Sequence, residues 1–223
     1  MRRRPLTRRC EARYASLSVR PPAIDARRFP ALAEYLGKLP AGLASYPAAL
    51  TKGILLRSAV SGHYFHSSWH DLPAEIASAM KTPPLPTSWL STVLTDAVFC
   101  AVADTFYPTK EAVVKWNFDR TIGLARVPMY SSLAKLAGLD RFVRAAVKVH
   151  ALFQRGTDLK VDLRGSEATV RLEHPPHLHG GLNHLSNEGV FRAALESSGA
   201  RKATVELVES TPTFARYECR WHA

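Results

Sequence analysis

The stretch DLKVDLRGSEATVRLE, Asp158–Glu173, decides the fold class of this chain. Apolar residues occupy alternate positions on both sides of RGSE, a turn-forming sequence at 164–167. Alternation over seven residues is the pattern of a strand with one buried face, and two such strands joined by a short polar turn form a hairpin. The stretch therefore predicts an antiparallel β-hairpin. Its inward-facing positions are Leu159, Val161, Leu163, Ala168, Val170 and Leu172.

The segments after the hairpin extend this sheet. A helical apolar pattern comes first, and we expect Ser186 or Asn187 to cap it and Gly199 to end it. Two further alternating stretches follow, Lys202–Ser210 and Thr213–Trp221. The last third of the chain is therefore predicted to be β-β-α-β-β, an antiparallel sheet with a helix on one face.

The residues before the hairpin have a different period, because apolar residues recur there at every third or fourth position. The helices expected from this pattern span 29–39, 46–60, 72–80, 89–106, 110–124, 128–138 and 139–156. The predicted class is α+β, in a single domain over 29–223. An N-terminal helical part (29–156) precedes the C-terminal β-β-α-β-β sheet part (157–223).

Residues 1–28 carry most of the net charge of +11, because they contain nine arginines and only two acidic residues. Clustered arginine can bind nucleic acid by releasing counterions from phosphate. The same composition is typical of a disordered extension, which is the interpretation we favour. We therefore expect a disordered Arg-rich tail, and nucleic-acid binding only through that tail.

The composition and motifs of the sequence also indicate the cellular location and the class of function. No apolar run reaches the roughly 18 residues that a membrane-spanning helix needs. The three cysteines are scattered, so no disulfide framework is expected and a reducing cytoplasm is the simplest location. The sequence contains no G-x-S-x-G, P-loop or dinucleotide-binding motif. We therefore expect a cytoplasmic protein that is not an enzyme and has no cofactor.

Four of the nine histidines lie close together in the sequence, at His174, His177, His179 and His184. They could be ligands of a metal if the segment folds back on itself, although their spacing matches no zinc pattern. They could instead belong to a flexible surface loop, and this is the interpretation that we favour. A third possibility is the mouth of a small-ligand pocket, with Arg192 on the first turn of the following helix.

A second cluster contains His63, His66 and His70, which would share one face of a helix. This spacing suits a metal better than the first cluster does. It lacks the glutamate of H-E-x-x-H, so metalloprotease chemistry is not indicated. We expect a structural or interface role for these side chains.

Three stretches together resemble a known family. They are LPAGLASYPAALTKGILLRSAV (39–60), FYPTKEAVVKWNFDRTIGLARVPMYSSLAKLAG (106–138) and GVFRAALESSGARKATVELVESTPTFARYECRW (189–221). In this order they resemble the myxobacterial paralogous family of unknown function. The layout is also similar to a wider group of small-molecule sensor folds, which contains the haem nitric-oxide-binding domain and the V4R domain.

This resemblance implies ligand binding or regulation rather than turnover. Haem would need an axial ligand, and His150 lies on the apolar face of the helix before the sheet. The haem-binding family pairs its ligand with a Y-x-S-x-R motif, which this chain lacks. We expect His150 to be a histidine at the edge of the core.

The sequence therefore predicts a regulatory domain that senses an unknown small apolar ligand, in a pocket between the helical part and the sheet. The candidate lining residues are Trp89, Trp116, Phe118, His150 and Phe191. The alternative is a module that binds a protein partner, or a second copy of the chain, without any ligand pocket. A third hypothesis is a metal- or haem-binding protein that uses one of the histidine clusters.

Overall fold

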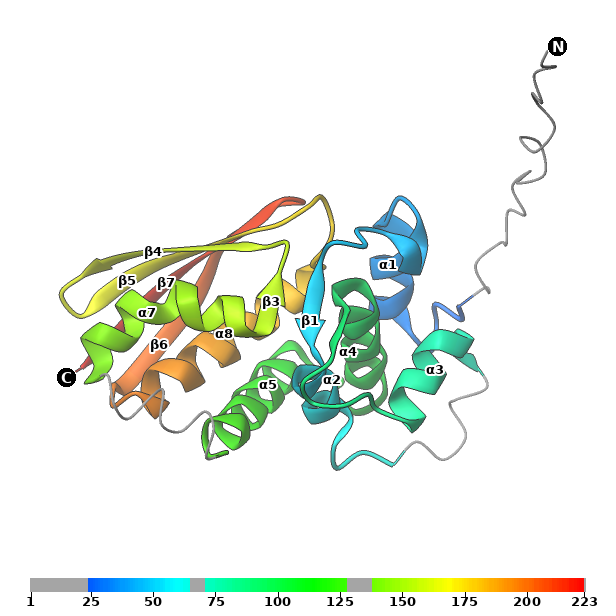
Figure 1. Ribbon diagram of the computed structural model, residues 1–223, viewed down its shortest axis with the longest axis horizontal. Helices are drawn as coiled ribbons and strands as arrows, with labels where there is room; N and C mark the ends of the chain where they lie inside the picture. Colours follow the sequence, from blue (N-terminus) through cyan, green and yellow to red (C-terminus); the bar gives the residue numbers. More distant parts are fainter. Residues whose placement is uncertain (1–23, 65–70, 128–137, 223) are drawn as a thin grey trace, which may run out of the picture.

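The computed structural model describes residues 24–64, 71–127 and 138–222 (Figure 1). The helical elements are α1 (Pro30–Lys38), η1 (Gly42–Ala44), α2 (Gly53–Val60), α3 (Ala74–Lys81), α4 (Thr92–Phe106), α5 (Lys110–Ala125), α7 (Gly138–Phe153) and α8 (Gly181–Ser197). The strands are β1 (Leu50–Lys52), β2 (Trp89–Ser91), β3 (Gln154–Arg155), β4 (Asp158–Arg164), β5 (Glu167–Glu173), β6 (Arg201–Ser210) and β7 (Phe214–His222). The predicted α+β class is confirmed.

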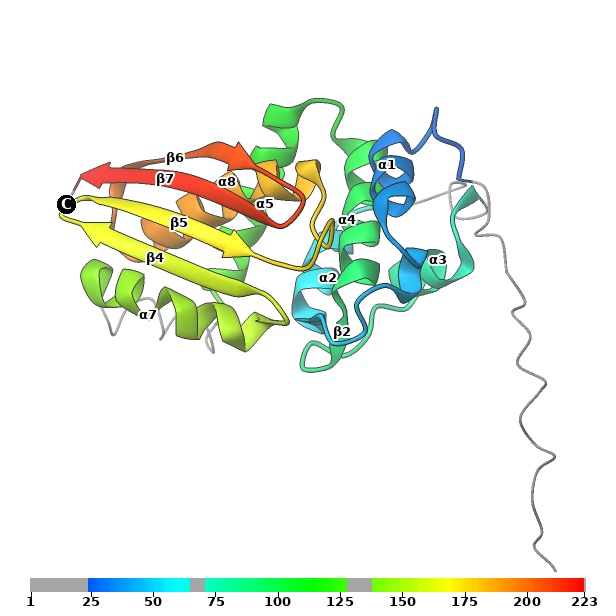
Figure 2. The same ribbon diagram turned by 90° about the horizontal axis from the view of Figure 1, so that it is seen from above.

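The four-stranded sheet has the order β4-β5-β7-β6, with every neighbouring pair antiparallel. The predicted hairpin is present, with Leu159 opposite Leu172 and Val161 opposite Val170. Helices α7 and α8 lie along one face of this sheet, whereas α1 to α4 gather at the other end of the molecule (Figures 1 and 2). The predicted β-β-α-β-β order of the C-terminal third is therefore confirmed.

Two apolar cores follow from this layout. The first surrounds α4, which is buried on nearly every side, as expected for a helix whose apolar residues extend around its whole circumference. The second lies under the sheet, where alternate residues of β7 point inward: Ala215, Tyr217, Cys219 and Trp221. Strand β7 thus shows the burial of every second residue that its sequence predicts.

Helices α5 and α8 join the two cores, and a glycine lets them approach closely. A Cβ atom on Gly189 would collide with the backbone oxygen of Val114 and approach the backbone nitrogen of Phe118 to 2.8 Å. Only glycine fits at this crossing, since both neighbours are backbone atoms of α5. The position of α8 against α5 therefore depends on Gly189.

For three helices the predicted first residue is wrong. The 46–60 segment begins with a turn followed by β1, and the 89–106 segment begins with β2, because β1 pairs with both β2 and β3 in a small sheet. Helix α4 is accordingly capped by Ser91, whose Oγ accepts from the backbone N–H of Leu94 at 3.4 Å. Helix α8 begins at Gly181, so Ser186 and Asn187 lie inside it and do not cap it.

Some predictions fall outside the described residues. These include the disorder of residues 1–23, the helix expected over 128–138 apart from its last residue, and the placement of His66 and His70. Residues 24–28 of the expected tail are described. The backbone oxygen of Asp25 there accepts from the backbone N–H groups of Arg28 and Phe29, and Arg28 forms an ion pair with Asp71. No helix in the described part is long and apolar enough to cross a membrane.

Candidate functional site

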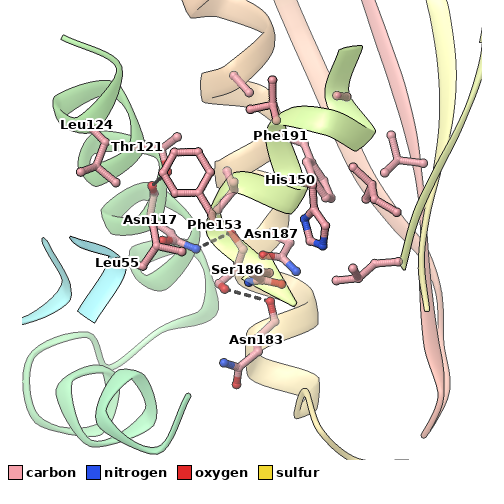
Figure 3. Close-up of a pocket in the computed structure, with 18 of the residues that line it drawn as sticks. Leu55, Asn117, Thr121, Leu124, His150, Phe153, Asn183, Ser186, Asn187 and Phe191 are labelled. Carbon is pink, nitrogen blue, oxygen red and sulfur yellow. Dashed lines mark hydrogen bonds between the residues drawn. The ribbon is translucent and has the colours of Figure 1, made fainter. Parts of the chain in front are cut away.

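A cavity of about 300 Å³ lies where the helical core meets the sheet core. Its walls come from α4, α5, α7, α8 and the inner face of the sheet (Figure 3). Small-molecule sites have volumes of about 300–1,000 Å³ and are mostly apolar with a few polar groups. The cavity matches the lower end of this range. Its sheet-side lining is apolar: Leu159, Val161, Ala168, Val170, Leu172 and Cys219.

Polar side chains from three helices also line the cavity. Figure 3 shows Asn117 of α5 and His150 of α7 near Asn183, Ser186 and Asn187 of α8. Asn117 Nδ2 donates to the backbone oxygen of Ser186 at 3.0 Å, which ties α5 to α8 beside the cavity. The polar lining is therefore fixed by contacts between helices.

Asp96 and His179 form a buried pair in this lining. His179 Nδ1 donates to Asp96 Oδ2 at 2.6 Å, and the two residues are 5% and 8% exposed, respectively. A carboxylate on Nδ1 fixes the orientation of the ring and leaves Nε2 to bind something else. His179 Nε2 is buried and has no hydrogen-bond partner in the described part of the chain.

Arg120 supplies the guanidinium of the cavity lining. Its Nη1 donates to the backbone oxygen of Leu55 at 3.2 Å, and its Nη2 donates to Asn117 Oδ1. The guanidinium lies 5.4 Å from the ring centre of Trp116 and 5.7 Å from that of Phe99. Burial lowers the pKa of Arg120 to about 10, an effect that the charge of Asp96 opposes, so the group stays charged at neutral pH. Its Nε is buried without a partner.

His150 lines the same cavity from α7. Its Nε2 lies 2.9 Å from Thr157 Oγ1, and the Thr157 hydroxyl donates to Gln154 Oε1 at 3.3 Å. Because that hydroxyl has one hydrogen, His150 Nε2 is the donor in its own contact. Burial, with a smaller effect of His179, lowers the pKa of His150 to about 4, so the ring is neutral at neutral pH.

Three histidines of the sequence cluster pack together beside the cavity, and the expected surface loop is wrong for them. His174, His179 and His184 are 7%, 5% and 1% exposed, respectively. The ring centre of His174 lies 5.0 Å from those of both His179 and His184. His177 is only half-buried and has a positive φ of 61°. The cause is the early start of α8, which places His184 in the first turn of a buried helix.

The other predicted site residues lie elsewhere. Phe191 lines the cavity, but Trp89, Trp116 and Phe118 do not. Each of these three packs against other side chains. Trp89 in β2 lies 4.1 Å from Lys52 Nζ and 4.0 Å from the guanidinium of Arg155. Placing Trp89 in the pocket is wrong because the segment is a strand of the small sheet.

Trp116 and Phe118 are accounted for in the same way. Trp116 stacks between Phe99 and Tyr107, with ring centres 4.8 and 4.6 Å away. Phe118 lies 4.8 Å from the guanidinium of Arg192. Arg192 lies well inside α8 rather than on its first turn, and it pairs with Glu196. Arg192 does not line the cavity, so the third possibility for the histidine segment does not hold for this residue.

The metal hypotheses find no support in the described residues. Among these residues, no group of three or more His, Cys, Asp or Glu side chains is placed to hold a metal ion. His63 lies beyond α2, and its Nε2 is 2.9 Å from the Tyr107 hydroxyl. The ring of His63 also packs edge-on against Trp116, with ring centres 5.8 Å apart.

Asp96 and Arg120 were not identified as site residues from the sequence. Asp96 lies inside the apolar run of α4, and an acidic residue within such a run is a signal of a buried polar site. Nothing comparable marks Arg120, which follows several polar positions of α5. Its role depends on contacts with Leu55, 65 residues away, and with the cavity.

Comparison with solved structures finds H-NOX domains, which have the haem nitric-oxide-binding fold. An oxygen-binding H-NOX domain related to soluble guanylate cyclases has a TM-score of 0.52 and 10% identity, covering 77% of this chain and 93% of that one. The unliganded Fe(II) H-NOX protein of K. algicida has a TM-score of 0.52 and 9% identity, covering 77% and 97%. A mutant of T. tengcongensis H-NOX has a TM-score of 0.53 and 10% identity, covering 77% and 98%.

At these identities the likeness concerns the fold, and it agrees with the similarity of the layout to the haem nitric-oxide-binding domain. No protein-family profile matches the chain. No curated protein matches it either.

The residues of the cavity do not fit haem. The histidine at the predicted axial position, His150, donates its Nε2 proton to Thr157. Arg120 is the single Lys or Arg among the described lining residues, and both of its terminal nitrogens are already bound. A cavity of about 300 Å³ is also small for a macrocycle with two propionates. Binding of haem would therefore require three contacts to rearrange: His150 with Thr157, Arg120 with Leu55, and Arg120 with Asn117.

Proposed function

We propose that this chain is a non-enzymatic regulatory domain that binds a small, largely apolar molecule. The observation that carries the proposal is the cavity between the two cores, which combines an apolar sheet face with a few fixed polar groups. Such a cavity is the common form of a small-molecule site. Its low volume favours a ligand smaller than haem.

The arrangement of the lining favours binding over turnover. Burial raises the pKa of the Cys219 thiol to about 12, so this sulfur is a poor nucleophile. The Ser186 hydroxyl donates to the backbone oxygen of Asn183 at 2.9 Å and is occupied within α8. Neither of these two groups is therefore a free nucleophile beside a base, which is what covalent catalysis requires.

The position of the cavity also supports a sensing role. Its walls include α7 and the sheet on one side and α4 and α5 on the other. A molecule that fills the space contacts both parts, so its binding would favour the arrangement of the two parts in which the contacts are complete. One solved structure of this fold is described as an oxygen-binding domain, which supports a ligand-sensing role for the present chain. The bacterial cytoplasm is the location that we propose for it.

Binding of a neutral apolar fluorophore tests this function. We expect 1-aminoanthracene to bind the purified full-length chain with blue-shifted, enhanced emission and saturable affinity. Native mass spectrometry should show one bound molecule per chain. An absence of saturable binding would contradict the proposed function, as would binding of several molecules with equal weak affinity.

A further inference from the structure

Two lining side chains of the cavity have a buried polar atom without a partner. These atoms are His179 Nε2 and Arg120 Nε. A buried polar atom left unpaired costs about 1–3 kcal/mol, and native structures leave few of them. Both residues belong to a cavity, so a bound molecule is the simplest source of the missing partners.

Both side chains approach α4 where this helix lines the cavity. Asp96 Oδ2 holds the His179 ring from α4. Phe99, one turn further along α4, lies 5.7 Å from the Arg120 guanidinium and also lines the cavity. The charge of Asp96 acts on the Arg120 pKa as well, which agrees with this placement. A single head group beside α4 is the simplest common partner for the two unpaired atoms.

The charges of the lining favour an acidic head group. Asp96 is the single carboxylate and Arg120 the single Lys or Arg among the described lining residues. Arg120 forms no ion pair with any described side chain, although Asp96 acts on it at longer range. A ligand carboxylate offers two acceptor oxygens, one for Arg120 Nε–H and one for the Nε2–H that His179 gains when it takes the proton of the acid. An ammonium group offers no acceptor, and an alcohol offers a single oxygen.

Resting on the function proposed above, we propose that the ligand is a small monocarboxylate whose head group binds Arg120 Nε and His179 Nε2. Its apolar body lies along the inner face of the sheet. A carboxylic acid that enters in neutral form gives its proton to His179 Nε2. The resulting imidazolium lies between two carboxylates, that of Asp96 and that of the ligand, and the net charge of the cavity is unchanged.

Displacement of 1-aminoanthracene by three eight-carbon probes tests this assignment. The probes are octanoate, 1-octanol and octylamine, and all are titrated into the full-length chain. Because hydrogen bonds between charged groups are stronger than those between neutral groups, we expect octanoate to bind at least about tenfold more tightly than 1-octanol. Octylamine should be the weakest of the three, because Arg120 repels its charge.

Variants of the two side chains identify the atoms involved. His179→Asn keeps a side-chain N–H for Asp96 and removes Nε2, and Arg120→Gln removes the guanidinium. Each variant should lower the affinity for octanoate by about tenfold and change the affinity for 1-octanol by less than about twofold. The matched controls are His177→Asn and Arg126→Gln. Both residues lie outside the cavity lining, so these substitutions should leave the affinity for both probes unchanged. If Arg120→Gln unfolds the chain, Arg120→Lys replaces it and should still weaken octanoate.

The outcomes separate this proposal from the proposed function. If 1-aminoanthracene binds but 1-octanol displaces it as well as octanoate does, the carboxylate assignment is wrong and the cavity function stands. The same conclusion holds if octanoate affinity is unchanged in both variants. If neither the fluorophore nor any probe binds, both proposals are wrong.

Discussion

His174 Nε2 and His184 Nε2 lie 2.9 Å apart in the buried interior, so one nitrogen must carry a proton and the other must not. The neighbours decide which one does. His174 Nδ1 lies 2.9 Å from the backbone oxygen of Pro175, which can only accept, so the His174 proton is on Nδ1. His184 Nε2–H therefore donates to His174 Nε2. Ser210 Oγ–H then donates to His184 Nδ1 at 2.7 Å. Both rings are neutral in this arrangement.

The first prediction concerns protonation of this pair. Burial, with a smaller effect of His179, lowers the pKa of His174 to about 4 and that of His184 to about 3. Histidine in the unfolded chain titrates near 6.5, so between pH 6.5 and these values the unfolded state binds more protons than the folded state. The contribution of the pair to stability is therefore constant at higher pH and is lost progressively as the pH drops below about 6.5.

Urea unfolding at several pH values measures this effect. We expect each of the two histidines to lower the free energy of unfolding by about 2 kcal/mol between pH 8 and pH 5. Long-range ¹H–¹⁵N spectra should show the Nδ1–H form of His174 and the Nε2–H form of His184 at pH 7. A free energy that is flat across this pH range would show that the pair is not buried in neutral form.

The second prediction concerns the crossing of α5 and α8. Gly189→Ala should lower the free energy of unfolding by about 3 kcal/mol or more, since the new methyl group meets the backbone of Val114 and Phe118. Gly123→Ala, in α5, is the matched control because its Cβ would meet nothing within 4 Å. We expect that variant to be unchanged or more stable by about 0.5–1 kcal/mol. Equal effects of the two substitutions in thermal unfolding would contradict the close approach.

The third prediction separates charge from hydrogen bonding at Asp96. Asp96→Ala leaves His179 Nδ1–H buried without an acceptor and should cost about 2–4 kcal/mol. Asp96→Asn keeps an oxygen for that N–H and should cost clearly less. Denaturant unfolding of both variants measures the difference. Equal losses would mean that the contact with His179 contributes little to the stability of the fold.

The fourth prediction concerns Trp89. Because Trp89 packs beside Lys52 and Arg155 and does not line the cavity, Trp89→Ala should leave the affinity for 1-aminoanthracene within about twofold. Phe191→Ala should change it, since Phe191 lines the cavity and contacts Tyr217 with ring centres 4.9 Å apart. Fluorescence titration of the two variants gives both values. A large loss of affinity in Trp89→Ala alone would reverse this assignment.

The sheet could be predicted from the sequence because its strands are long enough to show their period. β4 and β5 each span seven residues, and every second residue faces the core. Strands β1 and β2 have three residues each, which is too short for a period to be read. They form because distant segments pair with each other, so the sequence around them was read as helix instead.

The candidate site could be predicted only in part. The sequence brought the histidines of 174–184 together, but it gave no sign that three of them are buried. The contact between Asp96 and His179 joins residues 83 positions apart, and the Arg120 contact with Leu55 joins residues 65 apart. Contacts of this range follow from the packing of whole helices, which local periodicity does not report.

Filling the cavity tests the central claim most directly. Ala146 of α7 lines the cavity, whereas Ala151 of the same helix is exposed and does not line it. Ala146→Phe should therefore abolish saturable binding of 1-aminoanthracene, and Ala151→Phe should leave it unchanged, with the fold of both variants checked by circular dichroism. Retention of full affinity in a folded Ala146→Phe variant would contradict ligand binding between the helices and the sheet.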